Sequence, residues 1–142
     1  MKYDKLMRSG QAGIYAAPRI VGPLRAAARR SGIAWLDLDL AGVADRDAFL
    51  RRCGEAFSLP GYFGHNWDAL HECLLDNAGR GMPGAVVHWR RGTELSRRAP
   101  DAVTTALRIL QDVAAYWSGS GRTFLVVVDR DSARGHALPP LR

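Results

Sequence analysis

The feature of this sequence that most constrains its fold is a series of short apolar runs with helix-like segments between them. Residues 33–40 alternate leucine with aspartate, a period of two that predicts a strand with one buried face. Residues 85–89 and 123–128 are rich in valine and carry no formal charge, as in strands buried on both faces. Because helical segments separate these strands, the connections must cross over the sheet, which is therefore mostly parallel.

Apolar residues at helical spacing predict the helices of this α/β fold. They indicate helices over residues 20–30, 46–57 and 100–117, and a further helix that begins near Asn66. Asp45 and Asn66 are candidate N-caps, and Pro100 suits a first helical turn. The sequence thus predicts a small, mostly parallel sheet of three core strands packed with helices, and residues 13–15 are a candidate fourth strand.

The length of 142 residues and the 47% of hydrophobic residues are typical of one domain with one core. Residues 33–128 contain the predicted core elements, residues 1–32 form a basic βα extension, and residues 129–142 form a tail that we expect to be frayed. The longest apolar run covers only residues 124–128, whereas a membrane span needs about 18. We therefore expect no membrane association.

The net charge of +6 is unevenly distributed along the chain. Residues 1–30 contain seven Lys or Arg and one Asp, whereas residues 31–79 contain three Arg and eight Asp or Glu. One interpretation is a nucleic-acid-associated or regulatory protein whose basic N-terminus, with the arginines in residues 90–98, contacts phosphate. The alternative interpretation is that the arginines form a solvated surface.

The sequence predicts no catalytic, cofactor or metal site. Cys53 and Cys73 lie in apolar helical stretches, which favours buried, reduced thiols and a cytoplasmic protein. His71 and Glu72 begin like the zinc motif HExxH, but Leu75 occupies the place of the second histidine. No nucleophile, base and metal ligands occur together in a pattern typical of an enzyme.

The acidic residues of the helix after Asn66 are the most informative charged group. Asp68, Glu72 and Asp76 are spaced by four residues, so the first two share one face of the helix and the third lies near it. Such a row is either a solvated face or a negative surface that binds a cationic partner.

The segment that contains this helix resembles a known signature. Residues 57–74 read FSLPGYFGHNWDALHECL, and this sequence is similar to the signature of the barstar family, the intracellular inhibitors of barnase-type ribonucleases. The order of predicted strands and helices also agrees with that family over residues 33–128. The resemblance implies a barstar-like fold and a protein that is not an enzyme.

The resemblance further implies a function and a set of contact residues. In the family, the loop and helix of this signature block the active site of a ribonuclease, where acidic groups replace the phosphates of RNA. The expected partner is thus a ribonuclease or related nuclease toxin with a cationic active site. Glu72 stands where the family usually has aspartate, the central anchor. The expected partner-binding residues are Tyr62, Asn66, Asp68, His71, Glu72, Leu75, Asp76 and Asp112.

Overall fold

Four strands form one all-parallel sheet in the computed structural model, which describes residues 2–60, 65–76 and 81–141. The strand order is β1-β4-β3-β2, so β1 and β2 are the edges. The bounds are β1 Ala12–Ala16, β2 Ala34–Asp39, β3 Gly84–Arg90 and β4 Thr123–Val128. The prediction of an α/β fold with a parallel sheet is confirmed, and the candidate strand near the N-terminus is the edge strand β1.

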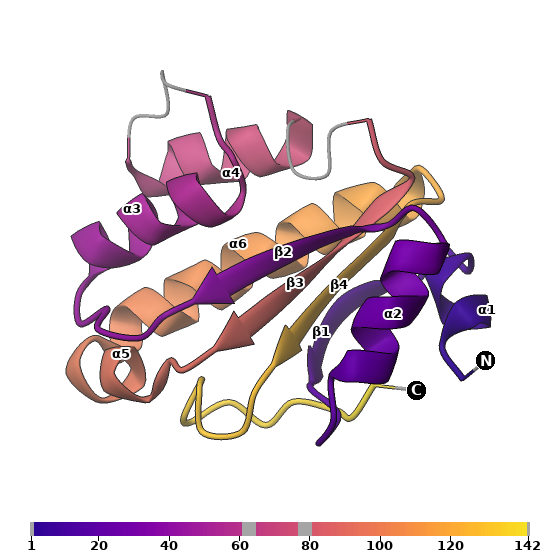
Figure 1. Cartoon of the computed structure of the whole chain (residues 1–142). Coiled ribbons are helices and arrows are strands. Elements are labelled where there is room, and N and C mark those ends of the chain that lie inside the picture. The colour runs from indigo at the N-terminus through magenta and orange to yellow at the C-terminus, as the bar shows by residue number, and fades with distance from the viewer. Residues whose placement is uncertain (1, 61–64, 77–80, 142) are drawn as a thin grey trace.

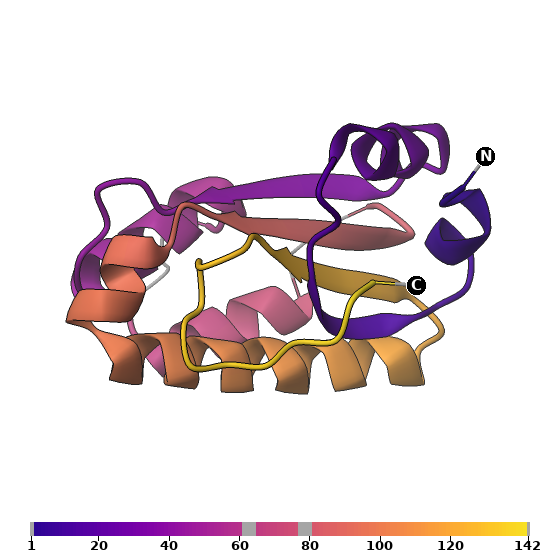
Figure 2. The same ribbon diagram turned by 90° about the horizontal axis from the view of Figure 1, so that it is seen from below.

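The helices cover the two faces of the sheet unequally (Figures 1 and 2). One face carries α1 Asp4–Met7 and α2 Gly22–Arg30; the other carries α3 Arg46–Ala56, α4 Trp67–Asp76, α5 Thr93–Arg98 and α6 Pro100–Gly119. The connection through α2 crosses from β1 at one edge of the sheet to β2 at the other. The later connections lead back toward β1, from β2 to β3 and from β3 to β4. Because crossovers between parallel strands are right-handed, this reversal places the later helices on the opposite face.

The side chains of the strands alternate between two hydrophobic clusters. Val86, Leu125 and Val127 pack with α1 and α2, whereas Val87, Trp89 and Val126 pack with α3, α4 and α6. All six residues of β4 are buried. The valine-rich runs therefore face helices on both sides, as their composition predicts.

The alternation in β2 has a different consequence. Leu36 and Leu38 pack into the cluster under α3, α4 and α6. Asp37 and Asp39 point to the opposite face, where Asp37 binds Arg90 at the end of β3 and Asp39 binds Arg91, the residue after β3. The charged half of the alternating pattern is thus held by cross-strand ion pairs.

The helix starts predicted at Asp45, Asn66 and Pro100 are confirmed, whereas the helix predicted from residue 20 begins at Gly22 and leaves Ile20 exposed. The amide of Ala48 donates to Oδ1 of Asp45 at 2.8 Å, and the amide of Ala69 donates to Oδ1 of Asn66 at 2.8 Å. Pro100 is the first residue of α6. The helices α1 and α5 are additions to the prediction, because four and six residues are too few to give a periodic apolar pattern.

The segment after β4, for which the sequence suggests fraying, is held against the protein. Ser132 and Ala133 are buried, and the carbonyl oxygen of Ser132 accepts a hydrogen bond from Nε1 of Trp89 at 2.8 Å. The segment then returns to the sheet, where the amide of Ala16 donates to the carbonyl oxygen of Pro139 at 2.8 Å. These contacts connect the end of the chain to both β3 and β1.

Candidate functional site: an acidic helix on the sheet

The helix α4 is fixed by its apolar side. Leu70, Cys73 and Leu74 are buried in the core cluster, and α4 packs against α6. Asn66 caps the N-terminus, since its side chain accepts the amide hydrogen bond of Ala69. The opposite side of α4 is consequently presented to solvent in one orientation.

The acidic residues occupy that solvent side. Asp68, Glu72 and Asp76 are all exposed, and none of them takes part in an ion pair within the described part of the chain. His71 and Leu75 are partly buried beside them. Among the described residues, no cation is therefore paired with these three carboxylates.

The pKa of the Cys73 thiol is affected by the negative charge of this helix. Burial raises its pKa above the ordinary value, and the carboxylates of Glu72 and Asp76 raise it further. Cys53, which is buried in α3, has a raised pKa from burial alone. Both cysteines are free and buried, as the sequence predicts, and neither is an activated nucleophile.

Two of the remaining predicted contact residues, Asp112 and Asn66, are exposed on α6 and at the start of α4. Asp112 is exposed on α6, the helix against which α4 packs, and Tyr116 follows one turn later with 57% of its surface exposed. Asn66 is exposed at the start of α4. Tyr62 lies outside the described residues. The structure thus brings the exposed residues of α4 and α6 to the same side of the sheet (Figure 1).

Four of the nine arginines in residues 1–30 and 90–98 form ion pairs with neighbouring carboxylates. Arg90 donates to both carboxylate oxygens of Asp37, at 2.7 and 2.8 Å, and Arg91 is paired with Asp39. Hydrogen bonds from these arginines lower the pKa values of Asp37 and Asp39 below the ordinary range. Two further arginines of the proposed surface form ion pairs, Arg30 with Asp4 and Arg98 with Glu94. This pairing weakens the nucleic-acid interpretation.

Sequence reasoning missed a polar network at the carboxyl end of the sheet. Nε2 of His88 lies 2.8 Å from Oδ1 of Asp129. This contact is beside the ion pair between Asp37 of β2 and Arg90 of β3. The signal in the sequence was a polar residue at every second position of two strands. The cross-strand register, which determines the partners, is visible only in the structure.

Metal and membrane sites are not evident. Across residues 2–60, 65–76 and 81–141, no three His, Cys, Asp or Glu side chains are grouped so as to hold a metal ion. In the same residues, no helix has the length and hydropathy required to span a bilayer.

Comparison with known proteins gives a family match. The family model described as barstar (barnase inhibitor) matches residues 33–129, which run from the start of β2 to the end of β4. A search of curated proteins gives no match. The matched region includes α4 and α6 and leaves out α1, β1, α2 and the C-terminal tail. Since the match covers more than half of the sequence, this chain belongs to the barstar family.

Proposed function

We propose that this protein inhibits a barnase-type ribonuclease or a related nuclease toxin by covering its active site with the exposed side of α4. The observation that carries the proposal is the row formed by Asp68, Glu72 and Asp76, which is exposed, forms no ion pair with another described residue, and lies on a helix held by its other side. Ribonuclease active sites are cationic because they bind RNA phosphates. A fixed row of carboxylates is complementary to such a site.

The proposed contact surface has a center and a rim. Glu72 occupies the middle of the row and is the proposed anchor, flanked by Asp68 and Asp76. His71 and Leu75 are partly buried beside the anchor and would supply apolar and polar contact area. Asn66, Asp112 and Tyr62 complete the proposed surface from the start of α4, from α6 and from the preceding loop.

This function requires no catalytic step by the protein itself. Members of the family are inhibitors, and the two cysteines here are buried thiols with raised pKa values. We further propose that the protein acts in the cytoplasm, where free thiols stay reduced. The inhibitor would thus protect a cell that makes the nuclease.

A titration of the protein into a barnase-type ribonuclease assay tests this proposal. We expect stoichiometric inhibition, and we expect the isosteric variant Asp68→Asn/Glu72→Gln to inhibit at least tenfold more weakly, a loss of about 1.4 kcal/mol or more. The matched control is Asp101→Asn/Asp131→Asn, which removes two carboxylate charges from exposed positions outside the proposed surface. Equal inhibition by both variants would contradict the role of α4.

The dependence of association on salt provides a second readout. Because the proposed surface is negative and its target is positive, the association rate should fall as ionic strength rises and screens their attraction. The Asp68→Asn/Glu72→Gln variant should show a smaller fall. An association rate that is independent of salt would count against electrostatic recognition.

A further inference from the structure

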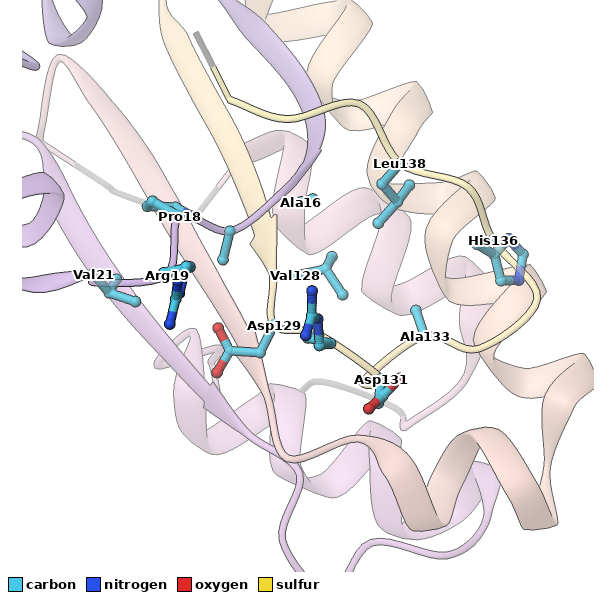
Figure 3. A pocket seen from close by; sticks show the side chains of 12 residues that line it. Ala16, Pro18, Arg19, Val21, Val128, Asp129, Asp131, Ala133, His136 and Leu138 are labelled. Carbon is cyan, nitrogen blue, oxygen red and sulfur yellow. The ribbon is translucent and has the colours of Figure 1, made fainter.

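A cavity lies at the carboxyl end of β1 and β4, outside the acidic helix (Figure 3). It has a volume of about 840 Å³ and lies between residues 16–21, which connect β1 to α2, and residues 128–138, which follow β4. Ligand pockets usually measure about 300–1,000 Å³. The cavity is therefore large enough for a small organic molecule.

The topology of the sheet explains why a cavity forms at this place. The strands β1 and β4 are parallel neighbours, and the chain leaves them in opposite directions. After β1 it continues to α2 on one face, whereas after β4 it packs Ala133 and Leu138 into the cluster on the other face. Such a divergence opens a crevice, and ligands of open parallel sheets recurrently bind in it.

The wall formed by the C-terminal tail is fixed at both ends. Ser132 is bound by Nε1 of Trp89 at 2.8 Å and by the amide of Gly92 at 3.0 Å, and Pro139 is bound by the amide of Ala16 at 2.8 Å. A preformed wall loses little conformational freedom when a ligand binds. The hollow is thus available before any ligand arrives.

The lining of the cavity combines an apolar surface with charged groups of both signs. The side chains of Ala16, Val128 and Leu138 supply the apolar surface. Arg19 and Arg130 supply two exposed guanidinium groups, and no ion pair within residues 2–60, 65–76 and 81–141 engages either of them. Their planar donor groups match the geometry of a phosphate.

The two carboxylates of the lining have different environments. Oδ1 of Asp129 lies 2.8 Å from Nε2 of His88 on β3, so this carboxylate already has a polar partner. Asp131 is exposed at the edge of the cavity. No ion pair among the described residues engages Asp131. A carboxylate in the same lining as two arginines suits a ligand that joins a phosphate to hydroxyl groups, because carboxylates accept the hydrogen bonds that hydroxyls donate.

From this arrangement we propose that the cavity binds a phosphorylated sugar, with the phosphate on Arg19 and Arg130 and a sugar hydroxyl on Asp131. The same chemistry occurs in a free sugar phosphate and in a nucleotide. The proposal is independent of nuclease inhibition, since nearly all of the lining lies outside the residues matched by the family model. It assigns a role to the N-terminal extension and to the tail, which together build the cavity.

A titration followed by amide NMR shifts tests the proposal, with ribose 5-phosphate, adenosine 5′-monophosphate and adenosine as probes. We expect saturable shifts confined to residues 16–21 and 128–138 with both phosphorylated probes and no such shifts with adenosine. Tighter binding of the nucleotide than of ribose 5-phosphate would identify the base as a further contact, and equal binding would identify the sugar phosphate as the whole ligand. Either result supports the proposed chemistry.

Variants decide whether the lining residues carry the binding. Arg19→Gln/Arg130→Gln should weaken binding at least tenfold, while the control Arg29→Gln/Arg108→Gln removes two exposed arginines of α2 and α6 and should leave binding unchanged. All four side chains are exposed, so we expect both variants to fold. Absence of saturable shifts, equal binding of adenosine, or an equal loss in the control would overturn the proposal.

Discussion

The glycine between β3 and α5 provides a direct test of how the C-terminal tail is held. A Cβ atom added at Gly92 would overlap the carbonyl oxygen of Ser132 and lie 2.8 Å from Nε1 of Trp89. The φ angle of Gly92 is −93°, which any residue adopts, so the cost of Gly92→Ala is steric and not conformational. To accommodate the methyl group, the backbone of Ser132 must move away.

The expected loss of stability follows from the hydrogen bonds that this movement strains. The carbonyl oxygen of Ser132 accepts from Trp89 at 2.8 Å and from Oγ of Ser96 at 3.1 Å, and Oγ of Ser132 accepts from the amide of Gly92 at 3.0 Å. All three bonds are buried. A hydrogen bond contributes about 1 kcal/mol net, so the loss of two or three should lower the free energy of unfolding by about 2–3 kcal/mol.

Urea denaturation measures this loss, with Gly119→Ala as the matched control. Gly119 ends α6, its Cβ would meet no atom within 4 Å, and its φ is not positive. Alanine there should leave the free energy of unfolding unchanged or raise it by up to about 1 kcal/mol. A Gly92→Ala protein within about 0.5 kcal/mol of the parent would refute the inference that Ser132 is held in place by these bonds.

Three further predictions concern single groups. Asn66→Ala should lower the free energy of unfolding by about 1 kcal/mol in urea denaturation, whereas Asn66→Asp should retain the cap; equal losses would contradict the capping role. Arg90→Met should raise the pKa of Asp37, measured by NMR titration. The pKa of Asp37 is lowered in the folded protein. The ion pair therefore stabilises the fold at pH values above the ordinary pKa of 3.8, and this stabilisation is lost as the pH falls through the lowered pKa. The effect is at most about 1 kcal/mol, because the side chain of Asp37 is 43% exposed, and an unchanged pKa would contradict the pairing. The alkylation rate of Cys73 in the Cys53→Ala protein should still be rising at pH 9, whereas a rate that levels off below pH 9 would contradict its raised pKa.

The parts of the fold that the sequence predicts are those with a local signal. The period of two in residues 33–40 and the valine-rich runs identify β2, β3 and β4, because burial of one or both faces restricts composition at each position. Asp45 and Asn66 identify helix starts because a cap acts on an amide only three residues away.

The features that the sequence does not predict depend on segments distant in the chain. The pairing of Asp37 with Arg90 requires the register between β2 and β3, and the contact of His88 with Asp129 requires the register between β3 and β4. The cavity combines residues 16–21 with residues 128–138, neither of which has a periodic pattern. Ser132 is buried and forms hydrogen bonds with Trp89 and Gly92. These partners are 43 and 40 residues away in the sequence, so the sequence of the tail alone does not indicate them.

The positions of the two proposed sites lead to a prediction about their coupling. The acidic helix α4 packs on α6 (Figure 1). The cavity lies at the carboxyl end of β1 and β4, and most of its lining is outside the family match. The residues proposed to bind at one site do not line the other, so the two binding free energies should add. Ribose 5-phosphate should therefore leave ribonuclease inhibition unchanged, and Asp68→Asn/Glu72→Gln should leave binding of the sugar phosphate unchanged. Coupling between binding sites is reciprocal, so a change in inhibition on adding the ligand would have to appear as an equal change in ligand affinity on adding the nuclease. Such a pair of changes would show that the sheet transmits binding between its two sites and would contradict their independence.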